Sequence, residues 1–279
     1  MLLLTDKHTS QFAFFYLACF LLSYAWYFYN GLLFSQIQPV FFVNRLDFAR
    51  NILMLSKLQR LLLGNNWLCA CFDVIYLILP VMLTVAVAAN SKGKKIIAFS
   101  TVIFSFIYGI FFSGISYISP ELMMGWVLIP LIFSANTLQG FYFYLHSIRI
   151  IFILMLVSAG LWKLKAGGLF NIEEMAGILL RQHQVYLVSN KDDWFTQFVF
   201  FLVQHKVTAY IFYLLATVAE LIFAAGLFTR KLDKFLIIVF CLFFLFDFFL
   251  MRINYFSWIV FMGCFYFSQF DIDKKKIIS

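Results

Sequence analysis

Long runs of apolar residues, broken only by short polar or charged clusters, constrain this chain more than any other feature. The first run covers about 12–34, and an α-helix needs roughly 20 residues to cross a bilayer. Hydrophobic residues make up 64% of the 279 and charged residues 12%, against about 45–50% and about 25% in a soluble domain. A soluble core of this size cannot bury so much apolar surface. The composition therefore excludes a soluble enzyme, a disordered chain and a nucleic-acid-binding domain, and indicates a polytopic membrane protein in contact with lipids.

The apolar runs predict an all-α fold: a transmembrane helical bundle of about eight spans with additional interfacial helices. The expected spans lie at about 12–34, 68–89, 96–118, 120–140, 147–164, 207–228, 235–251 and 254–270. Residues 35–67 mix cations with Leu, Phe and Ile, which predicts an amphipathic helix on the membrane surface. Residues 165–206 are too polar to span, and they predict short surface or re-entrant helices.

Basic clusters set the expected orientation of the spans. The net charge is +8, and eight spans place the clusters at 92–95, 230–234 and 274–276 on one side of the membrane. Because cytoplasmic loops carry the excess of Lys and Arg, both termini are expected in the cytoplasm of a multi-pass inner-membrane protein. This topology places segments 35–67 and 165–206 on the outer side of the membrane. The basic segment 35–67 therefore does not fit the rule that places Lys and Arg in the cytoplasm.

The distribution of apolar runs along the chain predicts a single integral membrane domain over residues 1–279. Its expected parts are spans 1 to 4 in 1–146, a four-span bundle in 147–270 and a basic cytoplasmic tail in 271–279. Little chain is left for a separate soluble domain.

Four ionisable residues fall inside or at the ends of expected spans, where charges are costly and commonly functional. They are Asp73, Lys163, Glu220 and Asp247. The expected topology puts all but Glu220 near one outward depth, so Lys163 and Asp247 are predicted to line one cavity, with Glu220 deeper. A buried lysine beside carboxylates suits base chemistry or forms a plain ion pair. A snorkelling role for Lys163 and an interfacial one for Asp73 stay open.

The remaining motifs exclude several kinds of site. His8, His146, His183 and His205 show no ligand spacing, so no metal site is expected. Phosphate-binding glycine loops and the serine-hydrolase elbow are absent from the sequence. The cofactor stays unknown, with a quinone or an isoprenoid lipid as the options that an aromatic-rich membrane protein leaves open.

Two short motifs resemble a known superfamily. Arg149 opens an apolar helix that ends Ser-Ala-Gly-Leu-Trp-Lys-Leu at 158–164, and Ala-Glu-Leu-Ile at 219–222 precedes Gly-Leu-Phe-Thr-Arg at 226–230. This pattern resembles the membrane domain that vitamin K-dependent gamma-carboxylases share with bacterial HTTM proteins, including the sporulation-delaying-protein B type. It is also similar to the DoxX/MauE four-helix family. The resemblance covers about residues 147–270, and spans 1–4 more loosely.

The resemblance implies a role for Lys163, which matches the lysine that acts as the base in the carboxylases. Asp247 departs from the family, which has a histidine at the matching position. No large extracytoplasmic domain follows the spans, so a complete gamma-carboxylase is not expected.

Three functions follow as hypotheses. The first is an inner-membrane protein that acts at the outer face in modification, maturation or export of a peptide or protein, with Lys163 as base and Asp247 and Glu220 in support. The second is a non-catalytic DoxX-like subunit of a larger complex, near quinone or thiol redox chemistry. The third, a small transporter that couples through Glu220 and Asp247, is weakened because no inverted repeat is apparent.

Overall fold

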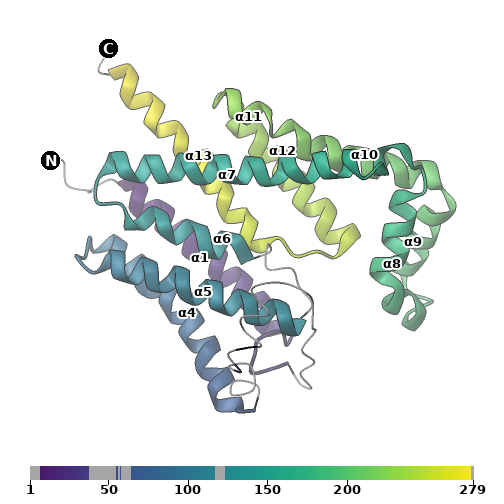
Figure 1. Ribbon diagram of the computed structural model, residues 1–279, viewed down its shortest axis with the longest axis horizontal. Helices are drawn as coiled ribbons and strands as arrows, with labels where there is room; N and C mark the ends of the chain where they lie inside the picture. Colours follow the sequence, from purple (N-terminus) through teal and green to yellow (C-terminus); the bar gives the residue numbers. More distant parts are fainter. Residues whose placement is uncertain (1–6, 38–54, 56, 58–63, 117–122, 278–279) are drawn as a thin grey trace. The chain divides into compact units, whose positions relative to one another are not determined.

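The computed structural model describes residues 7–37, 55, 57, 64–116 and 123–277, and the regular structure of these residues is helical (Figure 1). Its helices are α1 (Lys7–Tyr29), α4 (Asn66–Ala88), α5 (Lys94–Ser116), α6 (Met124–Leu128), η2 (Ile129–Ser134), α7 (Leu138–Lys165), η3 (Gly168–Phe170), α8 (Glu174–Ser189), α9 (Trp194–Gln204), α10 (Lys206–Ile222), α11 (Ala225–Phe228), α12 (Asp233–Phe246), η4 (Asp247–Met251) and α13 (Phe256–Ile277).

The chain divides into two compact units. Unit 1 holds Met1–Arg149 and Tyr255–Ser279, and unit 2 holds Ile150–Asn254. The boundary falls inside α7, three residues after the expected start of the second half at 147. Residues 255–270, which the sequence grouped with that second half, cluster with unit 1.

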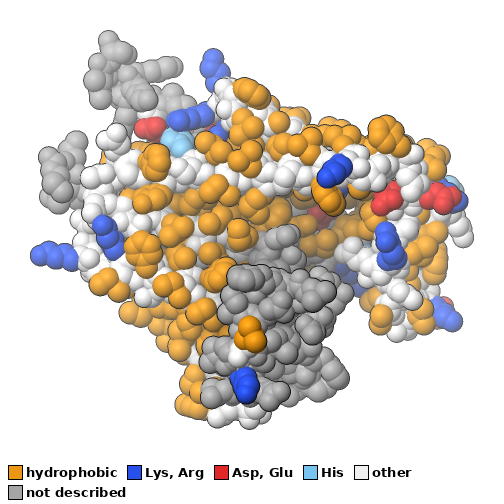
Figure 2. All heavy atoms as spheres, in the orientation of Figure 1, with side chains coloured by type: hydrophobic (Ala, Val, Ile, Leu, Met, Phe, Trp, Pro, Cys, Tyr) orange, Lys and Arg blue, Asp and Glu red, His pale blue; other side chains and the backbone are white. Residues whose placement is uncertain are grey.

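Six of the described helices are long and apolar enough to cross a membrane. They are α1, α4, residues Lys94–Ser113 of α5, α7, α10 with α11, and α12 with η4. Each overlaps one of the expected spans. Figure 2 shows apolar side chains over much of the described surface, as expected where lipid is the solvent. The chain is therefore an integral, multi-pass membrane protein.

The described residues do not confirm the expected total of eight spans. In the described part of the run at 120–140, α6 and the 3₁₀-helix η2 are followed by the first residues of α7, and Pro130 stands in the first turn of η2. A helix over Met124–Ser134 is about 20 Å long, which is short of the roughly 30 Å hydrocarbon core. The expected last span lies in α13, whose C-terminal part carries Asp271, Asp273 and three lysines. Most of the expected interfacial helix at 35–67 lies outside the described residues.

Unit 1 is built around aromatic side chains from α1, α6 and η2. Tyr16 and Phe20 of α1 pack edge-on against Trp126 of α6, with ring centroids 5.9 and 5.3 Å apart. Gly125 allows α6 to approach α13, because a Cβ there would lie 1.7 Å from the backbone oxygen of Ser257. Close backbone approach through small residues is typical of helix packing in membranes.

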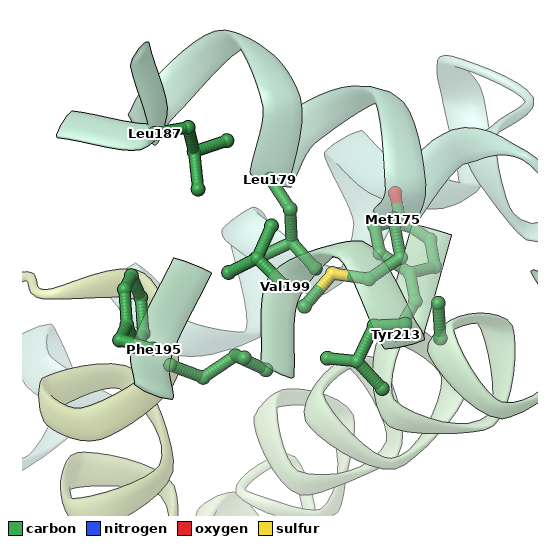
Figure 3. Close-up of a cluster of buried hydrophobic side chains, with 9 residues drawn as sticks. Met175, Leu179, Leu187, Phe195, Val199 and Tyr213 are labelled. Atoms are coloured by element: carbon green, nitrogen blue, oxygen red, sulfur yellow. The ribbon is translucent and has the colours of Figure 1, made fainter. Parts of the chain in front are cut away.

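In unit 2, helices α8, α9 and α10 enclose one hydrophobic cluster (Figure 3). Met175 and Leu179 of α8 meet Val199 of α9 and Tyr213 of α10, and all four are buried. Asp193 caps α9, since its carboxylate accepts hydrogen bonds from the Phe195 backbone N–H at 3.2 Å and the Tyr186 hydroxyl at 2.8 Å. The prediction of short helices within 165–206 is confirmed, while their place at the membrane surface stays a prediction.

Helix α8 also caps the end of the α12–η4 span. His183 Nε2 donates to the Leu250 carbonyl at 3.0 Å, and the Gln182 side chain donates to the Met251 carbonyl. These donors satisfy carbonyls that a helix end leaves without intrahelical partners. The next residue, Arg252, turns the chain with φ 52° and lies 3.9 Å from the ring centroids of Tyr186 and Phe195.

Candidate functional site

Lys163 and Glu220, from two membrane-spanning helices of unit 2, form an ion pair. Lys163 lies in the last turn of α7, and its Nζ donates to Glu220 Oε1 at 2.7 Å. The lysine side chain is 27% exposed and the glutamate side chain 6% exposed. The pair is therefore sheltered on the carboxylate side and partly open on the amine side.

Gly160 explains why the two helices come close enough for this contact. A Cβ at Gly160 would lie 2.8 Å from Leu221 Cδ2 and 3.4 Å from Glu220 Cβ. Residues three apart share one helix face, so Lys163 leaves α7 on the face that Gly160 presses against α10. The Gly-x-x-Lys spacing thus places the close contact of α7 with α10, at Gly160, one turn before the charge of Lys163.

The carboxylate of Glu220 is only half satisfied. Its Oε1 accepts from Lys163, whereas its buried Oε2 has no hydrogen-bond partner among the described residues. A buried polar atom without a partner is costly, and a catalytic role or a bound water or ion is among the explanations for such an atom. The Tyr213 ring completes the surroundings of the amine, with its centroid 5.7 Å from Lys163 Nζ.

Asp247 belongs to the same electrostatic environment. It is the first residue of η4, a π-helical turn that continues α12, and its side chain is buried. The Lys163 ammonium and the Glu220 carboxylate both act electrostatically on its carboxyl group. Single π-helical turns inside α-helices occur frequently at functional sites.

The three residues that the sequence singled out as catalytic candidates are therefore brought together, although in a different order. Glu220, expected to lie deeper, is the direct partner of Lys163, and Asp247 is buried in the following span of unit 2. That all three line a single open cavity stays a prediction. The cluster joins one cation to two carboxyl groups, so one ammonium cannot neutralise both as carboxylates.

Asp73, the fourth candidate, lies in unit 1, where its carboxylate accepts hydrogen bonds that hold the fold together. Its Oδ1 accepts from the Tyr108 hydroxyl at 2.8 Å and the Phe34 N–H at 3.2 Å. Its Oδ2 accepts from the N–H and the hydroxyl of Ser35 at 2.9 and 2.6 Å. Four donors on one carboxylate fasten the turn after α1 to α4 and α5.

An apolar groove of about 320 Å³ lies between α10 and α12 in unit 2. Its lining residues are Phe212, Leu215, Ala216, Ala219, Val239, Leu242, Phe243 and Phe246. Ala219 and Phe246 each directly precede one of the two acidic residues of the cluster. The lining suits hydrocarbon, and no side chain in it offers a polar group to a headgroup or a quinone ring.

Sequence reasoning missed a second polar cluster, in unit 1. His146 Nε2 lies 3.2 Å from Asp271 Oδ2, and His8 Nδ1 lies 3.4 Å from the Tyr142 hydroxyl. Arg149, one turn after His146 in α7, is buried with its guanidinium 5.0 Å from the centroid of Phe265. The two hydrogen-bonded pairs are 125 and 134 residues apart in sequence, so no spacing pattern could reveal them. Within the described part of the chain, no three His, Cys, Asp or Glu side chains gather as a metal site.

The comparisons with known proteins assign no family to the chain. No family model matches it, and neither a curated protein nor a solved structure matches it.

Proposed function

We propose that Lys163, Glu220 and Asp247 form the reactive centre of this integral membrane protein, with Lys163 accepting a proton from a peptide or protein substrate. The 2.7 Å contact between Lys163 and Glu220 inside two spans carries the proposal. Ionisable groups in spans are costly to insert and mark functional sites by default. Their concentration in unit 2 favours one centre over separate structural charges.

The hydrogen bond between Lys163 and Glu220 supports a path for the proton. A lysine acts as a base only as a neutral amine. Transfer of one proton along the hydrogen bond from Nζ to Glu220 Oε1 leaves an amine and a neutral carboxyl group. The amine then takes a proton from the substrate, whose anion balances the new ammonium. Glu220 returns its own proton to the product or to water, which restores the starting pair.

Asp247 supplies a second buried carboxyl group in unit 2. In its carboxylate form it holds the ammonium of Lys163 in place after substrate deprotonation. The unpartnered Glu220 Oε2 is free to hydrogen-bond to a substrate or water. Both acids thus position charge around one amine, and Lys163 alone meets the substrate proton.

The class of substrate and its location come from the resemblance and the topology. Similarity of residues 147–270 to the HTTM and carboxylase membrane domain supports a role in modification, maturation or export of a peptide or protein. The basic clusters support action at the outer face, with both termini in the cytoplasm.

The alternative is a non-catalytic, DoxX-like subunit near quinone or thiol redox chemistry. The close packing at Gly160 favours it, because an ion pair that locks α7 to α10 needs no reaction. The apolar groove between α10 and α12 also suits a lipid-like molecule held beside such a subunit.

The proposal is tested by comparing Lys163→Met with Lys165→Met in protein purified from its native membrane. Lys165 is the matched control, because it lies two residues on in α7, is exposed and lies 5.2 Å from the Trp162 ring centroid. Intact-mass analysis of the co-purifying peptides gives the result. We expect Lys163→Met to insert normally and retain unmodified peptide, with Lys165→Met matching the parent protein. Identical peptide masses in all three proteins would contradict the proposal.

A further inference from the structure

We propose that a groove between α8 and α9 binds an anionic phospholipid, with one acyl chain in the groove and the phosphate at Arg181 and Gln184. The groove lies in unit 2 and is separate from the charge cluster. The inference does not depend on the proposed function, because it rests on the shape and charge of the helical hairpin alone.

The groove has an apolar floor and a polar rim. It measures about 330 Å³ and is lined by Leu180, Arg181, Gln184, Leu187, Val188 and Phe200. Ligand pockets occupy about 300–1,000 Å³ and combine an apolar lining with a few polar groups. Five of the lining residues share a face of α8, and Phe200 of α9 closes the opposite wall. An amphiphile with a hydrocarbon part and a hydrogen-bonding head matches this lining.

The hairpin leaves an apolar face outside the cluster that it buries. Val185, Val188 and Trp194 are 81%, 67% and 68% exposed. Helix α9 contains no charged residue at all. In a protein that crosses the membrane, a helix pair of this kind has a reason to lie in the interface with its apolar face among acyl chains.

The charge at the rim selects an anionic head. Arg181 is the one Lys or Arg within α8, and its Nε donates to the Gly177 carbonyl at 3.3 Å. Among the described residues, no carboxylate forms an ion pair with Arg181. The acids that directly precede the two helices are engaged elsewhere, since Glu173 before α8 pairs with Lys206 and Asp193 caps α9.

The guanidinium therefore keeps donors for a ligand. Its planar fork of N–H groups matches phosphate oxygens, and the Gln184 amide adds donors beside it. A neutral lipid would use the floor and leave this rim unused.

Photocrosslinking tests the proposal on the full chain, reconstituted into phosphatidylcholine nanodiscs that contain a minor fraction of phosphatidylglycerol with a diazirine in one acyl chain. We expect crosslinks on residues 180–188 and on Phe200, displaced by unlabelled phosphatidylglycerol better than by phosphatidylcholine. Arg181→Gln should lower the labelling about fivefold, the scale of one cation near an anionic membrane surface. Lys191→Gln, which removes an exposed cation outside the groove, should leave it unchanged.

Each of the other outcomes overturns the proposal. No label at these residues would show that the groove is not in the bilayer. Equal labelling by a phosphatidylcholine probe, with no effect of Arg181→Gln, would show that the headgroup is not recognised. Displacement by glycerol phosphate alone would identify a site for soluble phosphates. Val188→Asp provides a second variant at an exposed position, and it should block labelling while the protein elutes as the parent does.

Discussion

Asp73 and Lys163 are both charged residues in spans, but they differ in how completely their surroundings satisfy them. Four hydrogen bonds fill both oxygens of the Asp73 carboxylate. Lys163 meets one oxygen of a carboxylate whose other oxygen has no partner among the described residues. A carboxylate whose oxygens are all hydrogen-bonded stabilises the fold. A carboxylate oxygen without a partner, beside a cation, can still accept a hydrogen bond from a substrate.

Asp73→Asn should therefore destabilise the protein without affecting its chemistry. The amide places an NH₂ group against donors, so a buried donor loses its partner at a cost of about 1–3 kcal/mol. Thermal unfolding of the purified protein in detergent measures the effect, and Asp192→Asn on the exposed turn before α9 is the control. Equal stability of the two variants would contradict a structural role for Asp73.

For single residues, the sequence identifies the candidate residues, but it does not predict which of them are in contact. A charged residue inside an apolar run can be recognised in the sequence alone, and Lys163, Glu220 and Asp247 are such residues. The pairing of Lys163 with Glu220 depends on how α7 crosses α10, and the two residues lie 57 positions apart in sequence. No ligand spacing surrounds His146 in the sequence, and its partner Asp271 lies 125 residues away.

At the scale of elements, the contact of α8 with the end of η4 should make stability depend on pH. Burial lowers the pKa of His183 below its ordinary value of 6.5, with a smaller contribution from Arg252, against the opposing hydrogen bond to Leu250. The unfolded chain then binds the proton more readily than the native one. The stability that neutral His183 contributes is complete above about pH 6.5 and is lost as the pH falls through the lowered pKa.

His183→Gln should remove this dependence, because the amide still donates to the Leu250 carbonyl and does not titrate. Unfolding temperatures between pH 5 and pH 8 report the change, with His205→Gln as the matched variant at an exposed histidine. A parent protein that is equally stable across that interval, or more stable at its acidic end, would contradict the prediction.

Gly125 and Gly177 differ in their surroundings, since Gly125 lies in a close contact between helices and Gly177 lies on an open helix surface. Gly125→Ala would drive a Cβ into the Ser257 carbonyl of α13, so we expect it to cost about 1–3 kcal/mol as an overpacked contact. Gly177→Ala meets nothing within 4 Å in α8 and should stabilise that helix by about 0.5–1 kcal/mol. The two unfolding temperatures should move in opposite directions. A shift in the same direction would contradict the packing of α6 on α13.

Helix existence was predictable from the apolar runs, since six expected spans overlap six described helices. The expected span at 120–140 is not confirmed, because a hydropathy profile shows apolar residues but not backbone hydrogen bonds. Pro130 removes a backbone donor, and the chain around it forms a 3₁₀-helix that stops at Ala135. The expected start of the second half at 147 lies three residues before the division within α7, but the grouping of residues 255–270 with unit 1 depends on tertiary contacts.

At the scale of the whole molecule, the number of crossings decides which side of the membrane Lys163 faces. With eight spans and a cytoplasmic N-terminus, the loop at Asp192 is external. If the six described spans alone crossed, that loop would be internal. A reporter at Asp192 should behave as external and one fused after Ser279 as cytoplasmic. An internal signal at Asp192 would contradict action at the outer face, and it would leave the geometry of the cluster intact.

The most direct test of Lys163 as a base is Lys163→Arg. Arginine keeps the positive charge and the hydrogen bond to Glu220, but it does not lose its proton in proteins. Intact masses of the peptides that co-purify from the native membrane compare it with the parent protein and with Lys163→Met. The proposal predicts that Lys163→Arg inserts and folds normally and retains unmodified peptide, as Lys163→Met does. Peptide modified as fully by Lys163→Arg as by the parent would contradict it, and would reduce the pair to a structural link between α7 and α10.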